Sequence, residues 1–321
     1  MRALVTGATG FIGSHLVRVL IDRGFDVRVL VRKTSNLRWI EGLPVQRFLG
    51  ELRDPASLEG IGEGADYVFH LAALLKGHRK EDYIEGNVTA TENLLRALSG
   101  SGDIRRFVYL SSQAAAGPAL HPKRESEEAR PVSYYGLAKF LTEEAVRRSG
   151  LPYTILRPPV VYGPRDGELL FYFRSLKRGY AFLPGNPEVV RIIHVEDLVE
   201  AIVDSALSDT TLGKTYFVAG EENMSAEDLL REIARALGIE RPMIIKLPPQ
   251  IVLPLVAFWS YLQRLFRKAS MVNPDKIREL SQPGWNCSTE AAKRDFGFTP
   301  RHSLKEGLYK TVTWYLKAGW L

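Results

Sequence analysis

Cysteine is almost missing from this chain: Cys287 is the single one among 321 residues. An intramolecular disulfide is therefore impossible, and a structural zinc site built on thiolates is disfavoured. Every stretch of about twenty residues contains helix breakers, so we do not expect a membrane-spanning helix. The first strand is expected to begin near residue 2, which leaves no room for a signal peptide. These features predict a cytoplasmic protein.

Blocks of consecutive Lys and Arg are also missing, and this argues against a nucleic-acid-binding arm. The formal net charge is nevertheless +6. A moderate positive charge suits an anionic cofactor, an anionic substrate or a membrane surface. Apolar residues make up 45% of the chain, which is ordinary for a protein with a sizeable core.

The first thirteen residues, MRALVTGATGFIG, carry the clearest pattern. An apolar strand around residues 3–5 runs directly into three glycines, Gly7, Gly10 and Gly13, and then into an amphipathic helix that Gly24 is expected to end. Glycine lets the backbone turn sharply and approach a ligand closely. The new helix points its free N–H groups at that turn, so the pattern predicts a cradle for a dinucleotide pyrophosphate.

Four further apolar strands alternate with helices along the first 164 residues. They are expected at 27–31, 45–49, 66–70 and 107–110, with a last one at 215–218. This alternation predicts an α/β fold: a doubly wound parallel Rossmann sheet with a smaller, mostly helical C-terminal substrate lobe. We expect residues 1–164, rejoined by about 194–219, to form the dinucleotide-binding domain. Residues 165–193 and 220–321 are expected to form the lobe.

Arg32 and Lys33 stand at the end of the second strand, where NAD-binding proteins usually carry an acid for the ribose 2′-hydroxyl. A cation there suits a 2′-phosphate, so NADP is the first choice of cofactor and NAD the second. Small residues in Leu71-Ala72-Ala73 would let the dinucleotide lie close to the end of another strand.

Tyr135 and Lys139 are four residues apart and so share one face of a predicted helix. A nearby ammonium, together with the positive charge of an oxidised nicotinamide, is expected to lower the pKa of the phenol, which suits Tyr135 to proton transfer with a substrate oxygen. Ser112 follows the fifth strand, and its hydroxyl is expected beside the same oxygen. Tyr134 is the rival phenol, but Lys139 lies off its face.

Together these residues resemble the extended short-chain dehydrogenase/reductase family, which includes the nucleotide-sugar epimerases and dehydratases. The resemblance covers nearly the whole chain. Its motifs are TGATGFIG at 6–13, HLAA at 70–73, Asn87 in GNVTATENLL, SSQAAAG at 111–117, YYGLAK at 134–139, LRPPVVYGP at 156–164, RIIHVEDLVEAI at 191–202 and a C-terminal FGFTPRHSLKEGL.

The resemblance implies that Tyr135 is the acid/base, Lys139 its activator and ribose anchor, and Ser112 the substrate-oxygen partner. It also implies that Pro158 passes the nicotinamide and that Leu52 borders the adenine. The expected cofactor-binding residues are Gly7, Thr9, Gly10, Phe11, Ile12, Gly13, Arg32, Lys33, Leu52, Leu71, Ala72, Ala73, Tyr135, Lys139 and Pro158. A homodimer through helices near 82–98 and 133–149 is a further implication.

Departures from the family pattern narrow the reaction. Sugar dehydratases of this family carry an Asp-Glu pair where this chain has Gln113 and Ala114, so dehydration is disfavoured. Arg191 is expected either to meet a substrate diphosphate, as in the sugar-nucleotide enzymes, or to tie parts of the protein together. His70 and His194 are interpreted as structural, and no metal-ligand cluster is expected around them.

The segment 247–268 is rich in apolar and aromatic residues and ends in Arg267 and Lys268. It is interpreted as a core helix with dimer contacts, or as a lid or a membrane-surface helix. It resembles the hydrophobic insert of steroid and flavonoid reductases more than the sugar-epimerase lobe.

Three functions remain open from the sequence. The first is an NADP-preferring oxidoreductase that interconverts a secondary alcohol and a ketone on a moderately hydrophobic substrate. The second is a nucleotide-sugar 4-epimerase or reductase, and the third is a sensor or assembly subunit that binds NADP(H) without turnover.

Overall fold

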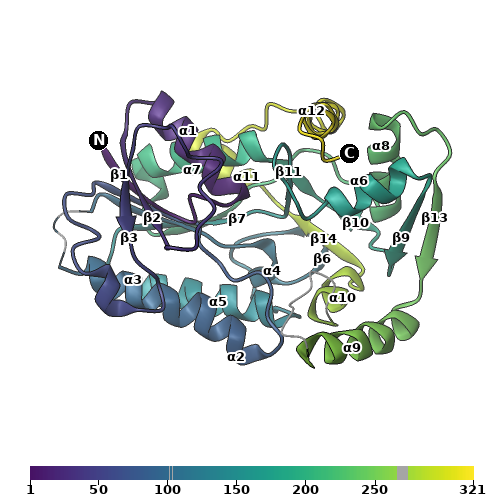
Figure 1. Ribbon diagram of the computed structural model, residues 1–321, viewed down its shortest axis with the longest axis horizontal. Helices are drawn as coiled ribbons and strands as arrows, with labels where there is room; N and C mark the ends of the chain where they lie inside the picture. Colours follow the sequence, from purple (N-terminus) through teal and green to yellow (C-terminus); the bar gives the residue numbers. More distant parts are fainter. Residues whose placement is uncertain (101, 103, 266–273) are drawn as a thin grey trace.

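A seven-stranded parallel sheet forms the centre of the computed structural model, which describes residues 1–100, 102, 104–265 and 274–321 (Figure 1). The strand order is β12-β7-β5-β4-β1-β2-β3. The strands are β1 (Arg2–Thr6), β2 (Asp26–Val31), β3 (Val45–Leu49), β4 (Tyr67–His70), β5 (Arg106–Leu110), β7 (Tyr153–Arg157) and β12 (Lys214–Phe217). The doubly wound Rossmann sheet predicted from the sequence is confirmed.

Helices cover both faces of this sheet, and each face has its own apolar core. On one face pack α1 (Phe11–Asp22), α7 (Val195–Leu207) and α11 (Glu290–Phe296). On the other pack α3 (Ala90–Leu98), α5 (Tyr134–Arg148) and the short 3-10 turn η1 (Pro55–Leu58). Successive strand residues alternate between the two cores, which is why the strands read as continuous apolar runs.

The helix predicted over 82–98 consists of three pieces: α2 (Lys80–Tyr83), a π-helical segment at Ile84–Thr89, and α3. Asn87 lies buried in the π segment, where its side chain accepts from the Leu74 N–H at 3.0 Å and donates to the Leu74 carbonyl at 3.2 Å. The segment therefore fixes the loop that follows β4, on the edge of the sheet where ligands are expected.

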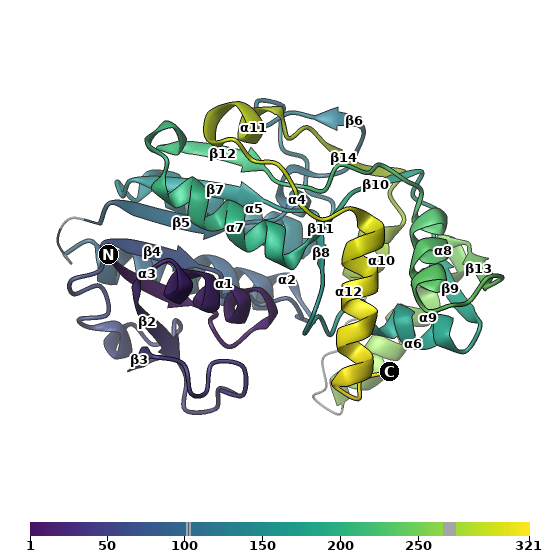
Figure 2. The same ribbon diagram turned by 90° about the horizontal axis from the view of Figure 1, so that it is seen from above.

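The remaining elements gather to the right of the large sheet in Figure 2. They include α6 (Leu170–Lys177), β9 (Tyr180–Pro184), α8 (Ala226–Ala236), β13 (Met243–Leu247), α9 (Pro249–Leu265), α10 (Pro274–Leu280) and α12 (Leu304–Lys317). A third apolar core joins α6, α8 and α12. Helices dominate, as predicted, and the parallel pair β9–β13 lies among them.

Short strands connect these elements to the edge of the sheet. They are β6 (Ala119–Lys123), β8 (Val160–Tyr162), β10 (Val189–Val190), β11 (Ile192–His194) and β14 (Gly284–Cys287). The division into two lobes stays a prediction; α11, from the segment assigned to the C-terminal lobe, packs on the core of the large sheet. Within the described ranges, no helix has the length and apolar character needed to cross a membrane.

A buried ion pair anchors α5 to the sheet. The Glu143 carboxylate accepts from Arg157 on β7 at 2.9 and 2.6 Å and from the Ser111 hydroxyl at 2.5 Å. Its side chain has no exposed surface, and that of Arg157 is 4% exposed. Burial alone would raise the pKa of this carboxyl, but the Arg157 guanidinium and the Ser111 hydroxyl hold it below its usual value. Glu143 is therefore ionised and fixes the position of α5 relative to the sheet.

Replacing Glu143 by Gln tests this anchor. The substitution leaves the Arg157 charge buried without its counter-charge, so we expect a loss of about 3–5 kcal/mol in the free energy of unfolding. Urea unfolding followed by circular dichroism gives the value. Glu144→Gln is the matched control, since its side chain is 38% exposed and its pair with Arg147 is worth at most about 1 kcal/mol. Equal losses in both variants would contradict the anchor.

Candidate active site

The turn between β1 and α1 is built on glycines because neighbouring backbone comes too close for a side chain. Gly7 has a φ of +73°, and a Cβ there would lie 2.7 Å from the Ala72 nitrogen. A Cβ on Gly13 would lie 2.1 Å from the Gly7 carbonyl oxygen. The Gly10 N–H donates to that same oxygen at 3.0 Å. The first turn of α1 thus packs directly on the turn that precedes it.

The N-terminus of α1 is prepared for an anion. Gly10 is the N-cap, no side chain in the described part of the protein caps it, and the first turn carries no acidic residue. Free N–H groups and the positive end of the helix dipole favour a pyrophosphate at this point. The residues present therefore fit a dinucleotide such as NAD(P).

A buried histidine fixes the neighbouring strand end. His70 Nδ1 lies 2.7 Å from Thr6 Oγ1, and His70 Nε2 lies 2.8 Å from Thr91 Oγ1. Burial, with a smaller effect of the Lys139 charge, lowers the pKa of His70 to about 3, so the ring is neutral. Thr6 Oγ1 also accepts from the Ala72 N–H at 3.3 Å. His70 is thus part of the core, as the sequence predicts, and it positions the 71–73 backbone.

The residues expected around the adenosine lie at the same edge, because β1 pairs with both β2 and β4. Arg32 and Lys33 are exposed directly after β2, and the Arg32 N–H donates to Ser35 Oγ at 2.9 Å. The Leu52 carbonyl accepts from Asn93 Nδ2 at 2.9 Å. The exposed Arg32 guanidinium and Lys33 ammonium are therefore available to an anionic group.

Lys139 joins the predicted catalytic helix to the fifth strand. The side chain is almost fully buried, with the residue 2% exposed, and Nζ donates to the Leu110 carbonyl at 2.6 Å. It also lies 4.3 Å from the centre of the Tyr109 ring. Burial lowers the pKa of Lys139 to about 7, although the nearby Glu143 charge opposes that shift. Leu110 lies two residues before Ser112, so this bond brings α5 to the Ser112 end of β5.

Ser112 and Tyr135 meet at this point. Ser112 Oγ accepts from the Ala114 N–H at 3.1 Å and so caps α4 (Gln113–Ala116). Burial raises the pKa of Tyr135, and the charges of Glu279 and Glu168 add to the rise, while Lys276 and a hydrogen bond with Ser112 lower it. Burial is the largest of these effects, so the pKa lies above its ordinary value, and the lowering expected from Lys139 together with an oxidised nicotinamide stays a prediction.

The phenol of Tyr134, the rival residue, lies at the protein surface. Tyr134 is 37% exposed, and the Arg278 guanidinium lies 5.7 Å from the centre of its ring. The Tyr135 ring instead meets the Tyr83 ring edge-on at 6.5 Å. The structure thus separates the two neighbouring tyrosines into one outer and one inner residue.

The Arg191 side chain connects separate backbone segments inside the protein. The residue is 8% exposed, and its guanidinium donates to the carbonyls of Cys287 at 2.6 Å, Gly220 at 2.5 Å and Glu221 at 3.2 Å. Of the two roles open from the sequence, these contacts match the one that joins parts of the protein. The other role, binding of a substrate diphosphate, stays a prediction.

Gln113 is a candidate that the sequence analysis missed. It is 3% exposed, its N–H donates to the Pro158 carbonyl at 2.8 Å, and its Nε2 has no acceptor among the described residues. A buried amide that lacks an acceptor is costly, so this donor points to a ligand or a water. The available signal was its position directly after Ser112.

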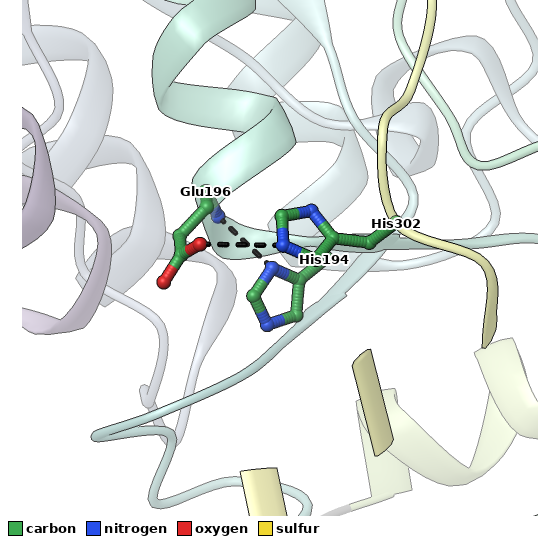
Figure 3. Close-up of side chains that lie close together, drawn as sticks. All are labelled: His194, Glu196 and His302. Carbon is green, nitrogen blue, oxygen red and sulfur yellow. Dashed lines mark hydrogen bonds and ion pairs between the residues drawn. The ribbon is translucent and has the colours of Figure 1, made fainter. Parts of the chain in front are cut away.

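His194 belongs to a cluster that the sequence analysis did not expect (Figure 3). Donor atoms of His194, Glu196 and His302 lie within 4.8 Å of one another, which suits a metal ion by distance. His302 Nε2 already lies 3.3 Å from a Glu196 oxygen, and both residues have further partners, since His302 Nδ1 contacts Asp197 at 2.8 Å and Lys310 Nζ contacts Glu196 at 2.5 Å. The cluster therefore connects α7 to the chain before α12, and the Lys310 ammonium neutralises the Glu196 carboxylate.

Comparison with known proteins gives consistent results over this framework. A model of the NAD dependent epimerase/dehydratase family matches residues 3–219. The chain is 31% identical to a ceramide reductase of Caulobacter vibrioides, over 99% of this chain and 95% of that protein. It is 30% identical to sterol demethylase protein B of Methylococcus capsulatus, over 99% of both chains.

Solved structures share the fold as a whole. MoeE5 in complex with UDP-glucuronic acid and NAD superposes with a TM-score of 0.77 at 26% identity, covering 99% of this chain and all of the other. Reductases of lipid-like substrates and enzymes of nucleotide sugars are thus both among the proteins that this chain is similar to.

Gly13→Ala tests the cradle. The added Cβ would lie 2.1 Å from the Gly7 carbonyl oxygen, so we expect the protein to lose about 1–3 kcal/mol of stability and most of its affinity for NAD(P). Thermal unfolding and fluorescence titration with NADPH measure the two effects. Gly167→Ala is the control, because a Cβ there meets nothing within 4 Å. A variant at Gly13 that binds the cofactor as well as this control would contradict the proposed packing.

Proposed function

The chain belongs to the NAD dependent epimerase/dehydratase family and is an enzyme of the oxidoreductase/epimerase type, and from that premise we propose that it interconverts a ketone and a secondary alcohol with NAD(P). The observation that carries this proposal is the hydrogen bond between Ser112 and the partly buried Tyr135, on the helix that also carries Lys139. The proposed substrate is moderately hydrophobic. The proposed catalytic residues are Ser112, Tyr135 and Lys139.

In this proposal the nicotinamide supplies or accepts the hydride when the cofactor is bound. Tyr135 donates its phenolic proton to the ketone oxygen, and Ser112 donates a hydrogen bond to the same oxygen. Lys139 is held by the Leu110 carbonyl one helical turn from Tyr135, and its amine, with a pKa lowered to about 7, would help to replace the proton. A phenol that burial keeps protonated suits the reductive direction.

The cofactor would be held by the glycine cradle and the free N–H groups of α1, with the 71–73 backbone beside it. NADP is preferred in this proposal because Arg32 and Lys33 are exposed at the end of β2. Leu52 and Pro158 complete the expected contacts, with adenine and nicotinamide respectively.

Two observations favour an apolar substrate over a nucleotide sugar. The Nη1 and Nη2 groups of Arg191 donate to three backbone carbonyls, so these two groups are not offered to a diphosphate, while Nε has no partner among the described residues. The names of two relatives, a ceramide reductase and a sterol demethylase protein, also point to lipid-like substrates. Ceramides and sterols are largely hydrocarbon.

A nucleotide-sugar 4-epimerase or reductase is the second candidate. It needs the same Ser112, Tyr135 and Lys139, and MoeE5, which shares the fold, binds UDP-glucuronic acid and NAD. Binding of NADP(H) without turnover is the third. The two are distinguished from the first by turnover of apolar ketones.

Further expectations about partners remain proposals. We expect a homodimer through α3 and α5, a cytoplasmic location, and peripheral membrane contact or a lid formed by residues 247–268. Ile251 and Leu255 on α9 are 58% and 65% exposed, which gives that segment an apolar outer face. Residues 266–268 of the segment, which include Arg267 and Lys268, lie outside the described part.

Tyr135→Phe tests the proposed chemistry. Removing the hydroxyl leaves the substrate oxygen without a proton donor, so we expect the rate of ketone reduction to fall at least about a thousandfold while NADPH binding is kept. NADPH absorbance in the presence of a 3-oxo ester or a 3-oxosteroid gives the rate. Tyr134→Phe is the matched control and should keep its activity, because this phenol faces outward. Retained turnover in Tyr135→Phe would refute the acid/base role.

Arg32→Asp tests the choice of dinucleotide. The exchange replaces a cation at the end of β2 by an acid, so we expect NADP affinity to fall about a hundredfold and NAD affinity to hold or rise. Isothermal titration with both nucleotides measures the ratio. Arg178→Asp, at the exposed end of α6, controls for the change in net charge. Equal losses for NADP and NAD would show that Arg32 does not read the 2′-phosphate.

A further inference from the structure

The helix that carries Tyr135 begins against a helix from the far end of the chain. α10 lies beside one end of α5 in Figure 1, and Asp275 on α10 is 7% exposed there. Its two carboxylate oxygens accept from the backbone N–H groups of Tyr134 at 2.7 Å and Tyr135 at 3.1 Å. The first N–H groups of a helix have no partner within it, so Asp275 supplies the acceptor that they need.

A second carboxylate of α10 reaches the residue before these two. Glu279 accepts from the Ser133 hydroxyl at 2.6 Å, and Ser133 Oγ in turn accepts from the Gly136 N–H at 2.9 Å. Glu279 is 6% exposed, and its other oxygen lies 2.9 Å from Lys276 Nζ. Two buried carboxylates thus lie at the positive end of α5, where the helix dipole favours negative charge.

Serine also caps α8 and α12, where Ser225 and Ser303 contact Asp228 and Glu306 of the same helices. In α12 the Leu304 N–H also donates to Glu222 at 2.8 Å. In α5 the local Ser133 is held by Glu279, nearly 150 residues further along the chain. The start of α5 is therefore capped by its own Ser133 and is tied to α10 by two buried carboxylates.

We propose that Asp275 and Glu279 are positioning residues for the Tyr135 phenol, so that the C-terminal part of the chain completes the catalytic helix. The inference rests on the proposed function of Tyr135, while the bonds that carry it are independent of any substrate. Since α9 packs against α10, the segment expected to border the substrate is continuous with this cap.

The charges around the phenol come from several elements. The charged groups that act on it are Glu279 and Lys276 on α10 and Glu168 before α6. Lys139 lies on α5 itself, and Asp275 lies at the helix start. Burial raises the pKa of Tyr135 most, Glu279 and Glu168 raise it further, and Lys276 lowers it. Opposite changes at Glu279 and Lys276 should therefore move the phenol in opposite directions.

The geometric part is tested without any substrate. In Asp275→Asn the backbone amides of Tyr134 and Tyr135 lose a charged acceptor, so we expect them to exchange hydrogen about tenfold faster in the full-length protein. Exchange mass spectrometry of the peptide around 133–136 gives the value. Asp228→Asn, in the first turn of α8, is the matched control and should leave that peptide unchanged. Unchanged exchange in Asp275→Asn overturns the cap.

The functional part uses NADPH and a 3-oxo ester as the probe. Glu279→Gln should move the alkaline limb of the kcat profile to lower pH by about half a unit or more, and Lys276→Met should move it upward. Glu279→Asp should restore the wild-type profile, and Asp275→Asn should lower kcat about tenfold with NADPH affinity kept. Shifts of the same sign in Glu279→Gln and Lys276→Met would overturn the positioning role. Faster exchange in Asp275→Asn with no turnover by the wild type would instead refute the proposed function and leave the cap in place.

Discussion

A line of four side chains along α5 holds the site together, and the buried carboxylate of Glu143 is its centre. Tyr135, Lys139, Glu143 and Arg147 follow one another at intervals of four residues, so they share one face of the helix. Glu143 binds Arg157 on β7 and Ser111 at the end of β5, while Lys139 binds the Leu110 carbonyl. Ser111 and Leu110 flank the strand end that delivers Ser112. The ion pair of Glu143 with Arg157 therefore fixes how far α5, which carries the Tyr135 phenol, lies from the end of β5.

The C-terminal part of the chain reaches this edge through polar contacts in addition to its apolar packing on the large sheet. Asp275 and Glu279 bind the start of α5, Arg191 binds the Cys287 carbonyl, and His302 binds Asp197 at the start of α7. Hydrogen bonds of this kind depend on direction, so they fix orientation where apolar packing alone allows sliding. A catalytic centre between two parts of a chain needs that kind of alignment.

The parts that the sequence predicts well are those whose cause is local. Gly7 and Gly13 are required by a turn and a helix start within a few residues, and Tyr135 with Lys139 by the helical repeat. Contacts between distant residues have no such signal. Nothing near Asp275 in the chain indicates that its partners are the amides of Tyr134 and Tyr135. The π segment around Asn87 likewise leaves the apolar pattern unchanged, and the role of Arg191 depends on which carbonyls the fold brings to it.

Burial raises the pKa of Tyr135 and lowers the pKa of Lys139, and both shifts have the same cause. The charged form of the phenol is the anion and that of the amine is the cation, and a water-poor site disfavours both. The pair is thereby shifted toward its neutral state, in which the phenol keeps its proton and the amine is near its titration point. Such a pair is prepared to give a proton to an oxygen that gains negative charge, and Lys139 near pH 7 is suited to take part in restoring it. This electrostatic state supports the proposed reduction of a ketone, since a phenol that keeps its proton can give it to the oxygen that gains negative charge.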